Sequence, residues 1–142
     1  MEIKVIAKLM SIKDSEINLF KRDYVTLVEL MNNLSGQYLS QKEAIEQFAS
    51  EQASVDNVDA MLNGRYYLQD MQKHANTLHL SLKEVEKQKE AAFETLSSAV
   101  TGLKVLEKMH DRRLKDLHSM HLKKEELESD EVAITMFNKV NN

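Results

Sequence analysis

A seven-residue repeat of apolar side chains occupies the second half of this chain, and it constrains the fold more than any other feature of the sequence. Its two core positions, a and d, are apolar at fourteen of eighteen places over more than eight heptads. The a positions are Leu68, Ala75, Leu82, Lys89, Leu96, Leu103, His110, Leu117 and Lys124, and the d positions are Met71, Leu78, Val85, Ala92, Ala99, Leu106, Arg113, Met120 and Leu127. A repeat of this length is typical of a coiled-coil helix.

A similar repeat comes earlier and is apolar at ten of thirteen positions. These positions are Phe20, Tyr24, Leu27, Met31, Leu34, Tyr38, Gln41, Ile45, Phe48, Gln52, Val55, Asp59 and Leu62. Residues 54–64 are rich in Asp, Asn and Gly, which favour turns, and the sequence contains no proline that could stop a helix elsewhere. We therefore predict helices at about 3–56 and 64–137, a turn at about 57–63, and Asn63 as the N-cap of the second helix.

The two repeats complement each other in side-chain size. The first carries bulky aromatic residues, and the second offers Ala75, Ala92 and Ala99 as gaps for them. Facing layers of a core interdigitate when large residues meet small ones. We predict an all-α single domain spanning residues 1–142, in which two long helices form an antiparallel coiled-coil hairpin.

The second predicted helix is longer than the first. A turn centred near residue 60 places residue i opposite roughly residue 120 − i, so the first helix ends opposite about residue 115. The remaining residues to Phe137 extend about 30 Å further at 1.5 Å per residue, and beyond Lys124 the apolar residues no longer follow the heptad. Because an isolated helix end is marginal in water, we expect this segment to fray when free and to order on another molecule.

Charged side chains are sorted along the chain. Residues 41–63 hold one lysine against five acidic residues, residues 104–124 carry a net charge of +4, and residues 125–131 carry −5. Such clusters commonly do no more than solvate a helix face. They can also orient a partner, because charge patterning steers docking.

Catalysis has no visible place on this chain. There is no cysteine, and the three glycines at positions 36, 64 and 102 form no phosphate-binding loop. A two-helix hairpin also lacks the water-excluding pocket that acid–base chemistry needs. His118, His121 and Glu125 share a helix face but fall short of the four ligands of a structural metal site. We expect no catalytic residue, cofactor, metal or small-molecule substrate.

Membranes and nucleic acids are weaker candidates as partners. The chain shows neither an apolar run of 18 residues nor a signal-peptide pattern in its first 13 residues. Its net charge of −4 argues against general nucleic-acid binding. The N-terminal apolar residues alternate with lysines and could form a membrane-surface helix, but we favour packing of this segment against the second helix near residues 110–117.

The run "GLKVLEKMHDRRLKDLHSMHLKKEELESDEVAITMF" resembles the C-terminal pattern of the FliJ family of flagellar export proteins. Here a Leu-Glu-Lys cluster at residues 106–108 is followed by Arg112 and Arg113, an acidic-polar stretch, and the pair Asp130 and Glu131 shortly before Phe137. The chain length, the break near residue 60 and the aromatic opening "RYYLQDM" of the second helix agree as well. The resemblance covers essentially the whole chain.

The resemblance implies a non-enzymatic, cytoplasmic part of the bacterial type III export apparatus, peripheral at the cytoplasmic face of the inner membrane. Members form a two-helix antiparallel coiled coil similar to the stalk subunit of rotary ATPases. Their paired helix termini enter the ring of the export ATPase and promote its assembly into a hexamer. They also contact the membrane export-gate protein and help to escort substrate chaperones.

The resemblance also assigns residues to these partners. The residues implied for the ATPase are Arg112, Arg113, Lys115, Leu117, Met120, Leu127, Asp130, Glu131 and Phe137. Those implied for the export gate are Met71, Ala75, Leu78 and Leu82, which are also positions of the helix–helix seam. We expect a monomer when the chain is free. Two alternatives stay open: the equivalent stalk of a virulence secretion system, and a generic scaffold that dimerises through the same seam.

Overall fold

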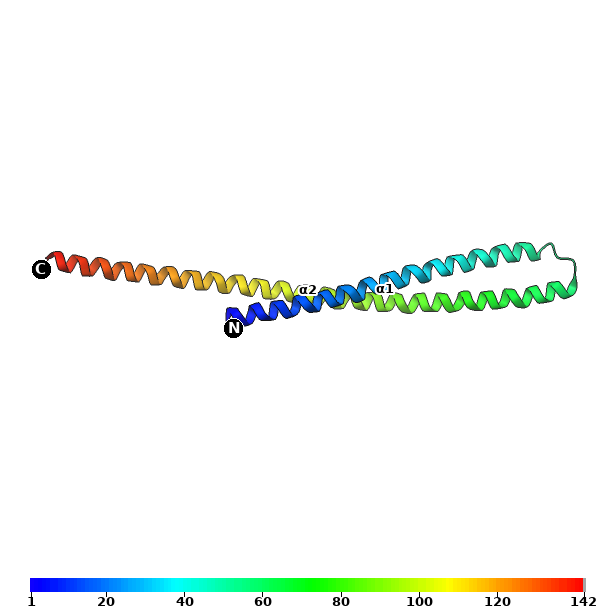
Figure 1. Ribbon diagram of the computed structural model, residues 1–142, viewed down its shortest axis with the longest axis horizontal. Coiled ribbons are helices and arrows are strands. Elements are labelled where there is room, and N and C mark those ends of the chain that lie inside the picture. The colour runs from blue at the N-terminus through cyan, green and yellow to red at the C-terminus, as the bar shows by residue number, and fades with distance from the viewer. Residues whose placement is uncertain (142) are drawn as a thin grey trace. The chain divides into compact units, whose positions relative to one another are not determined.

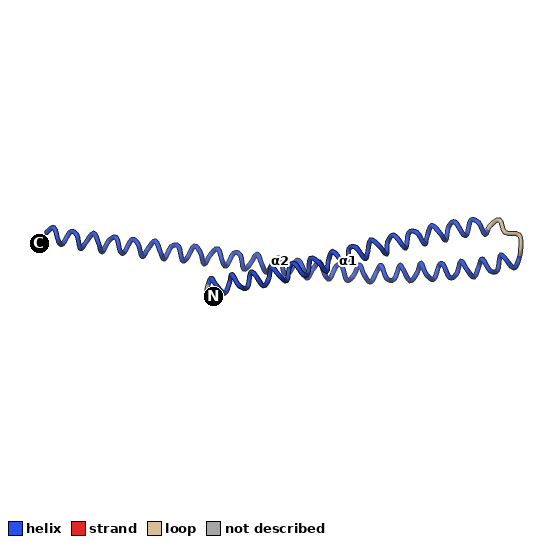
Figure 2. The backbone as a smooth tube through the Cα atoms, viewed as in Figure 1, coloured by secondary structure: helices blue, strands red, loops and turns tan. Residues whose placement is uncertain are grey.

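The computed structural model describes residues 1–141, with side chains described through Val140, and contains two helices (Figure 1). Helix α1 spans Ile3–Gln52 and helix α2 spans Val58–Asn141. Residues 53–57 connect them (Figure 2). No strand occurs in the part of the chain that is described. The predicted all-α hairpin with a longer second helix is confirmed.

The turn lies earlier than the predicted 57–63. Helix α1 ends at Gln52 and not at residue 56, and α2 begins at Val58 and not at residue 64. The N-cap is Asn57: its Oδ1 accepts a hydrogen bond from the Asp59 backbone N–H at 2.9 Å, and its carbonyl accepts one from Met61 N–H, also at 2.9 Å. Asn57 therefore satisfies N–H groups that the first turn of a helix leaves unpaired, and Asn63 is an interior residue of α2.

Gly64 is likewise helical and does not break α2. It is buried, and a Cβ atom at this position would meet the side-chain amide of Gln52 at the end of α1. The missing side chain therefore lets the two helices approach closely beside the turn.

The chain divides into two compact units. One consists of Asn18–Ser97, and the other combines Met1–Ile17 with Ser98–Asn142. That the two act as a single domain stays a prediction.

The unit Asn18–Ser97 is held together by a seam of apolar and aromatic side chains. Ala75, Leu78 and Val85 are buried in it. Three ring pairs join α1 to α2: Tyr24 with Phe93 at a centroid distance of 5.8 Å, Tyr38 with His79 at 5.6 Å, and Phe48 with Tyr67 at 4.8 Å. Aromatic pairs at these separations contribute beyond the apolar area that they bury.

These ring pairs fix the register of the antiparallel helices. The predicted register places residue 96 opposite Tyr24 and residue 72 opposite Phe48, whereas the observed partners are Phe93 and Tyr67. The partners in α2 therefore lie several residues earlier than predicted, because the turn itself lies earlier.

The unit of Met1–Ile17 and Ser98–Asn142 has a smaller core. Ile6, Ile17 and Ala99 are buried, and Ile6 is only 1% exposed. The Lys13 side chain lies over Gly102, where an added Cβ would meet its Cε at 2.8 Å. At the start of the chain, Arg113 Nε donates a hydrogen bond to the Met1 carbonyl oxygen at 3.0 Å. The N-terminal segment thus contacts α2 at Arg113, inside the predicted range of residues 110–117, and also at Gly102, which precedes that range.

Candidate functional site

Beyond Arg113, helix α2 continues with no other described segment against it. We call residues 114–140 the overhang. Every side chain from Asp111 to Val140 is exposed, and in Figure 1 the orange and red part of α2 runs past the N-terminus alone. The predicted extension of the second helix beyond the first is therefore present in the structure, and it is helical throughout.

The overhang exposes an unusual amount of apolar surface. Ten large apolar side chains in it are between 47% and 84% exposed. They are Leu114, Leu117, Met120, Leu122, Leu127, Val132, Ile134, Met136, Phe137 and Val140. A water-exposed helix normally keeps such residues to one face and buries that face against a neighbour. Exposed apolar surface on this scale is typical of a binding site.

The apolar residues of the overhang occupy two different faces. At 3.6 residues per turn, the residues Leu117, Met120, Leu127 and Ile134 continue the a/d stripe of the upstream coiled coil. The predicted loss of the heptad beyond Lys124 is therefore wrong for Leu127 and Ile134. Val132, Ala133 and Met136 project from another side, where they line a shallow groove together with Glu125, Glu128 and Ser129. The overhang can therefore contact a partner along its stripe, along this groove, or on both sides.

The charged residues assigned to the ATPase are all accessible. Arg112, Lys115, Asp130 and Glu131 are exposed and point into solvent. Arg113 is exposed too, although its Nε is engaged with Met1. These side chains fit a role in orienting a partner, since exposed charges steer docking more than they add affinity.

In the group of His118, His121 and Glu125, the structure shows one contact, between His121 and Glu125. His121 Nε2 lies 3.2 Å from Glu125 Oε1, and both side chains are more than half exposed. Among residues 1–141, no three His, Cys, Asp or Glu side chains are placed to hold a metal ion.

The residues assigned to the export gate lie in the seam of the unit Asn18–Ser97. Ala75 and Leu78 are each 7% exposed, and Met71 and Leu82 are half-buried. The Met71 carbonyl also accepts a hydrogen bond from Gln41 Nε2 at 3.1 Å. A partner cannot reach Ala75 or Leu78 while the hairpin is closed, but it can reach Leu80, which is 66% exposed on the same stretch of α2.

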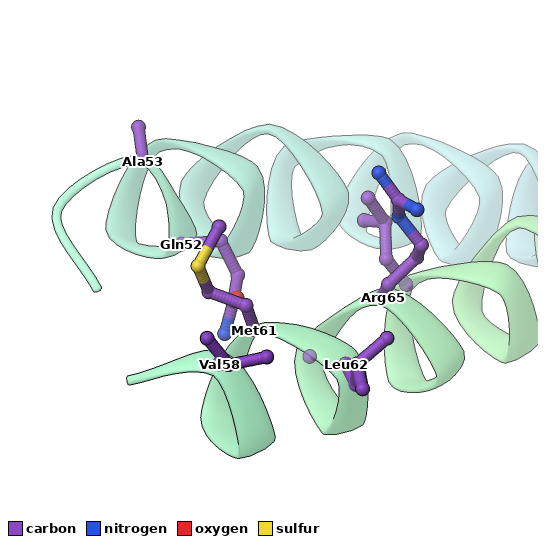
Figure 3. Close-up of a pocket in the computed structure, with 8 residues that line it drawn as sticks. Gln52, Ala53, Val58, Met61, Leu62 and Arg65 are labelled. Atoms are coloured by element: carbon purple, nitrogen blue, oxygen red, sulfur yellow. The ribbon is translucent and has the colours of Figure 1, made fainter. Parts of the chain in front are cut away.

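A cavity beside the turn is a feature that the sequence did not reveal. It is open to solvent, has a volume of about 470 Å³, and is lined by Gln52, Ala53, Val58, Met61, Leu62, Gly64, Arg65 and Leu68. Figure 3 shows Gln52 and Met61 between the ends of the two helices, and Arg65 extending toward α1. The sequence held one signal for it: the predicted turn contains three large apolar residues, Val58, Met61 and Leu62, and turns seldom do. In the structure these three side chains are exposed at the pocket.

Comparison with known proteins identifies the family. The family model described as "Flagellar FliJ protein" matches residues 8–142, nearly the whole chain. Neither a curated protein nor a solved structure matches. No helix in the described chain is both long and apolar enough to cross a membrane. The match extends over the turn, both helices and the overhang, and the chain belongs to the FliJ family of flagellar proteins.

Proposed function

We propose that this chain is a stalk that activates the ATPase of the flagellar export apparatus, and that it does so through its overhang. Membership of the FliJ family gives the chain a role related to flagellar export, in a family that is a non-enzymatic component of that process. The family match favours the flagellar system over the virulence system.

One observation carries the proposal: a helical segment of 27 residues, 114–140, has every side chain exposed and presents ten large apolar ones. The upstream hairpin is already complete without it, because the seam positions from Leu68 to His110 are buried or half-buried. Burying the apolar surface of the overhang would therefore stabilise a complex with another molecule, by roughly 25 cal/mol per Å² of apolar surface removed from water.

The experiment measures ATP hydrolysis by the purified export ATPase with increasing amounts of this chain. We expect the chain to raise turnover and ATPase oligomerisation, and we expect deletion of residues 117–142 to abolish both effects. Circular dichroism of the truncated chain should still show the upstream hairpin. Stimulation that survives the deletion would remove the proposal.

A matched control separates the overhang from exposed apolar residues in general. Leu39 in α1 is 57% exposed, which is close to the exposure of Leu127. Replacing Leu39 by serine should leave stimulation unchanged, whereas the same change at Leu127 should reduce it.

The gate-protein and chaperone partnerships implied by the family belong to the same proposal. In the closed hairpin, the gate protein would contact exposed residues of the stretch 71–82, such as Leu80, because Ala75 and Leu78 are buried. A pull-down with the cytoplasmic part of the gate protein tests this contact, and retention that is equal for the wild type and Leu80→Asp would contradict it.

A further inference from the structure

The overhang carries an apolar stripe that is interrupted by charges of both signs. Along the a and d positions, Leu117, Met120, Leu127 and Ile134 alternate with Lys124 and Glu131. All six side chains are exposed. In the upstream hairpin the same a and d positions are covered by α1, so the stripe of the overhang is a coiled-coil seam with one helix present.

We propose that the partner of this stripe is the overhang of a second copy of this chain, paired in the antiparallel direction. The dimer uses the same stripe as the ATPase contact proposed above, so the two interactions exclude each other, and at high concentration the dimer replaces the monomer expected from the sequence. It also differs from a scaffold that dimerises through the hairpin seam, because that seam is filled within each chain by contacts such as Phe48 with Tyr67.

The charge distribution selects the antiparallel direction. Residues 114–124 of the overhang hold three lysines against one aspartate, whereas residues 125–131 hold five acidic residues and no basic one. Two overhangs aligned in parallel would place the acidic halves together, and like charges at close range are unfavourable. The antiparallel arrangement places the basic half of each copy against the acidic half of the other.

The heptad then selects the register. In an antiparallel coiled coil, a positions face d positions, so the allowed alignments differ by whole heptads. One alignment makes three kinds of seam pair between the two copies: Leu117 with Ile134, Met120 with Glu131, and Lys124 with Leu127. Its flanking positions pair Lys123 with Asp130 and His121 with Glu128, and the two-fold symmetry of the dimer repeats each pair.

The neighbouring alignments are worse for identifiable reasons. Shifting the second copy by a heptad in one direction brings Lys123 against its own symmetry mate and places Ile134 opposite His110, which α1 already half-buries. Shifting it in the other direction brings Asp130 against Asp130. Only the intermediate alignment pairs opposite charges at the positions that flank the seam, and it overlaps the overhangs almost along their full length.

Two charged seam residues, Lys124 and Glu131, limit the strength of this dimer and define its register. Lys124 would lie beside Leu127 of the second copy, and its ammonium group can extend along its aliphatic stem to the acidic residues there. A polar residue at a seam position lowers stability and specifies alignment. We therefore expect a reversible dimer that dissociates on dilution and in high salt.

Sedimentation equilibrium of the full-length chain tests the proposal at low ionic strength, from about 1 µM to about 500 µM. A monomer–dimer equilibrium that shifts toward monomer with added salt is expected. A constant monomer mass over the whole range would overturn the proposal, as would a dimer that survives in the chain truncated after residue 113.

Charge reversal provides a sharper test, because the basic half and the acidic half of the overhang can each be reversed in a separate variant. The double variant Lys123→Glu/Lys124→Glu should weaken dimerisation by about 100-fold, and so should Asp130→Lys/Glu131→Lys, since each places like charges together. An equimolar mixture of the two should recover a mixed dimer. Failure of the mixture to associate overturns the register even if both variants are monomeric.

Two further measurements complete the design. The double variant Lys115→Glu/Lys139→Glu makes the same change in net charge at positions outside the stripe, and it should dimerise like the wild type. Because the chain has no cysteine, variants Leu117→Cys and Ile134→Cys can report direction. Their mixture should form the mixed disulfide on oxidation, whereas a parallel dimer would give Leu117→Cys cross-linked to itself.

Discussion

Arg113 and Met1 mark the point at which the second helix loses its neighbour: the Nε of Arg113 donates a hydrogen bond to the Met1 carbonyl oxygen at 3.0 Å. On one side of this contact, the seam positions of α2 through His110 are buried or half-buried, and on the other, all side chains to Val140 are exposed. The bond itself lies in solvent, so its contribution to stability is small. The covered part of α2 is held by apolar residues further along α1.

The most deeply buried of these apolar residues is Ile6, which is 1% exposed. We expect Ile6→Ala to lower the free energy of unfolding by about 2–4 kcal/mol, because it removes buried methyl groups and leaves a cavity. Val5 is its control: it is 46% exposed, and Val5→Ala should cost less than about 0.5 kcal/mol. Urea unfolding followed by circular dichroism measures both, and equal effects would mean that the N-terminal segment does not pack as described.

The start of α2 gives a second prediction. Asn57 accepts the Asp59 N–H through its side chain, so Asn57→Ala should destabilise the hairpin by about 1 kcal/mol. Asn63→Ala should be neutral or stabilise by up to about 0.5 kcal/mol, because Asn63 lies inside a helix, where alanine is the better residue. Thermal unfolding of the two variants distinguishes the observed turn from the predicted one, for which the order of effects would be reversed.

The location of the turn shows why sequence reasoning succeeded for the helices and failed for their ends. The heptad determines which side chains face inward, and each predicted seam position from Phe20 to Val55 is indeed buried or half-buried. The predicted turn, however, contains two asparagines, Asn57 and Asn63, and either could cap a helix. The structure uses Asn57 and places Asn63 inside α2, next to Gly64, whose missing side chain leaves room for Gln52 across the hairpin.

The candidate site divides in the same way. The exposure of the overhang follows from the difference in helix lengths, which the sequence contains. The burial of Ala75 and Leu78 follows from their seam positions. The cavity beside the turn was missed, because its lining exists only once Val58, Met61 and Leu62 are placed in α2 and not in a loop.

Substitutions at Leu78 and Leu80 can distinguish an effect on folding from an effect on partner binding in residues 71–82, the stretch implied for the export gate. Leu78 is 7% exposed and Leu80 is 66% exposed. Leu78→Asp should cost more than about 3 kcal/mol, because it buries a charge without a partner, whereas Leu80→Asp should change stability by less than about 0.5 kcal/mol. Differential scanning calorimetry tests the contrast. Similar unfolding temperatures for both would contradict the closed seam.

The overhang should also differ from the hairpin in its dynamics. Its backbone hydrogen bonds are shielded by no neighbouring segment in the described chain, and a helix without tertiary contacts opens readily. We expect amides of residues 114–140 to exchange with solvent at least about tenfold faster than those of residues 68–106. Hydrogen exchange with mass spectrometry measures this in dilute solution. Equal protection of both segments would contradict the expected fraying and would point to a covered overhang.

Met120 and Leu127 connect the overhang to activity. They are 67% and 64% exposed, so replacing both with serine removes no packing from the free hairpin, and its unfolding midpoint should stay unchanged. If the ATPase buries these side chains, the double variant should lower the stimulation of ATP hydrolysis at a fixed subsaturating concentration by at least about tenfold, since central apolar contacts dominate binding energy.

The charge-reversal variant Lys123→Glu/Lys124→Glu, which cannot pair with itself, separates this loss from an effect of self-association. A loss in the serine variant that the monomeric charge variant does not share assigns Met120 and Leu127 to the ATPase contact. Full stimulation by the serine variant would mean that the ATPase contacts other residues of α2.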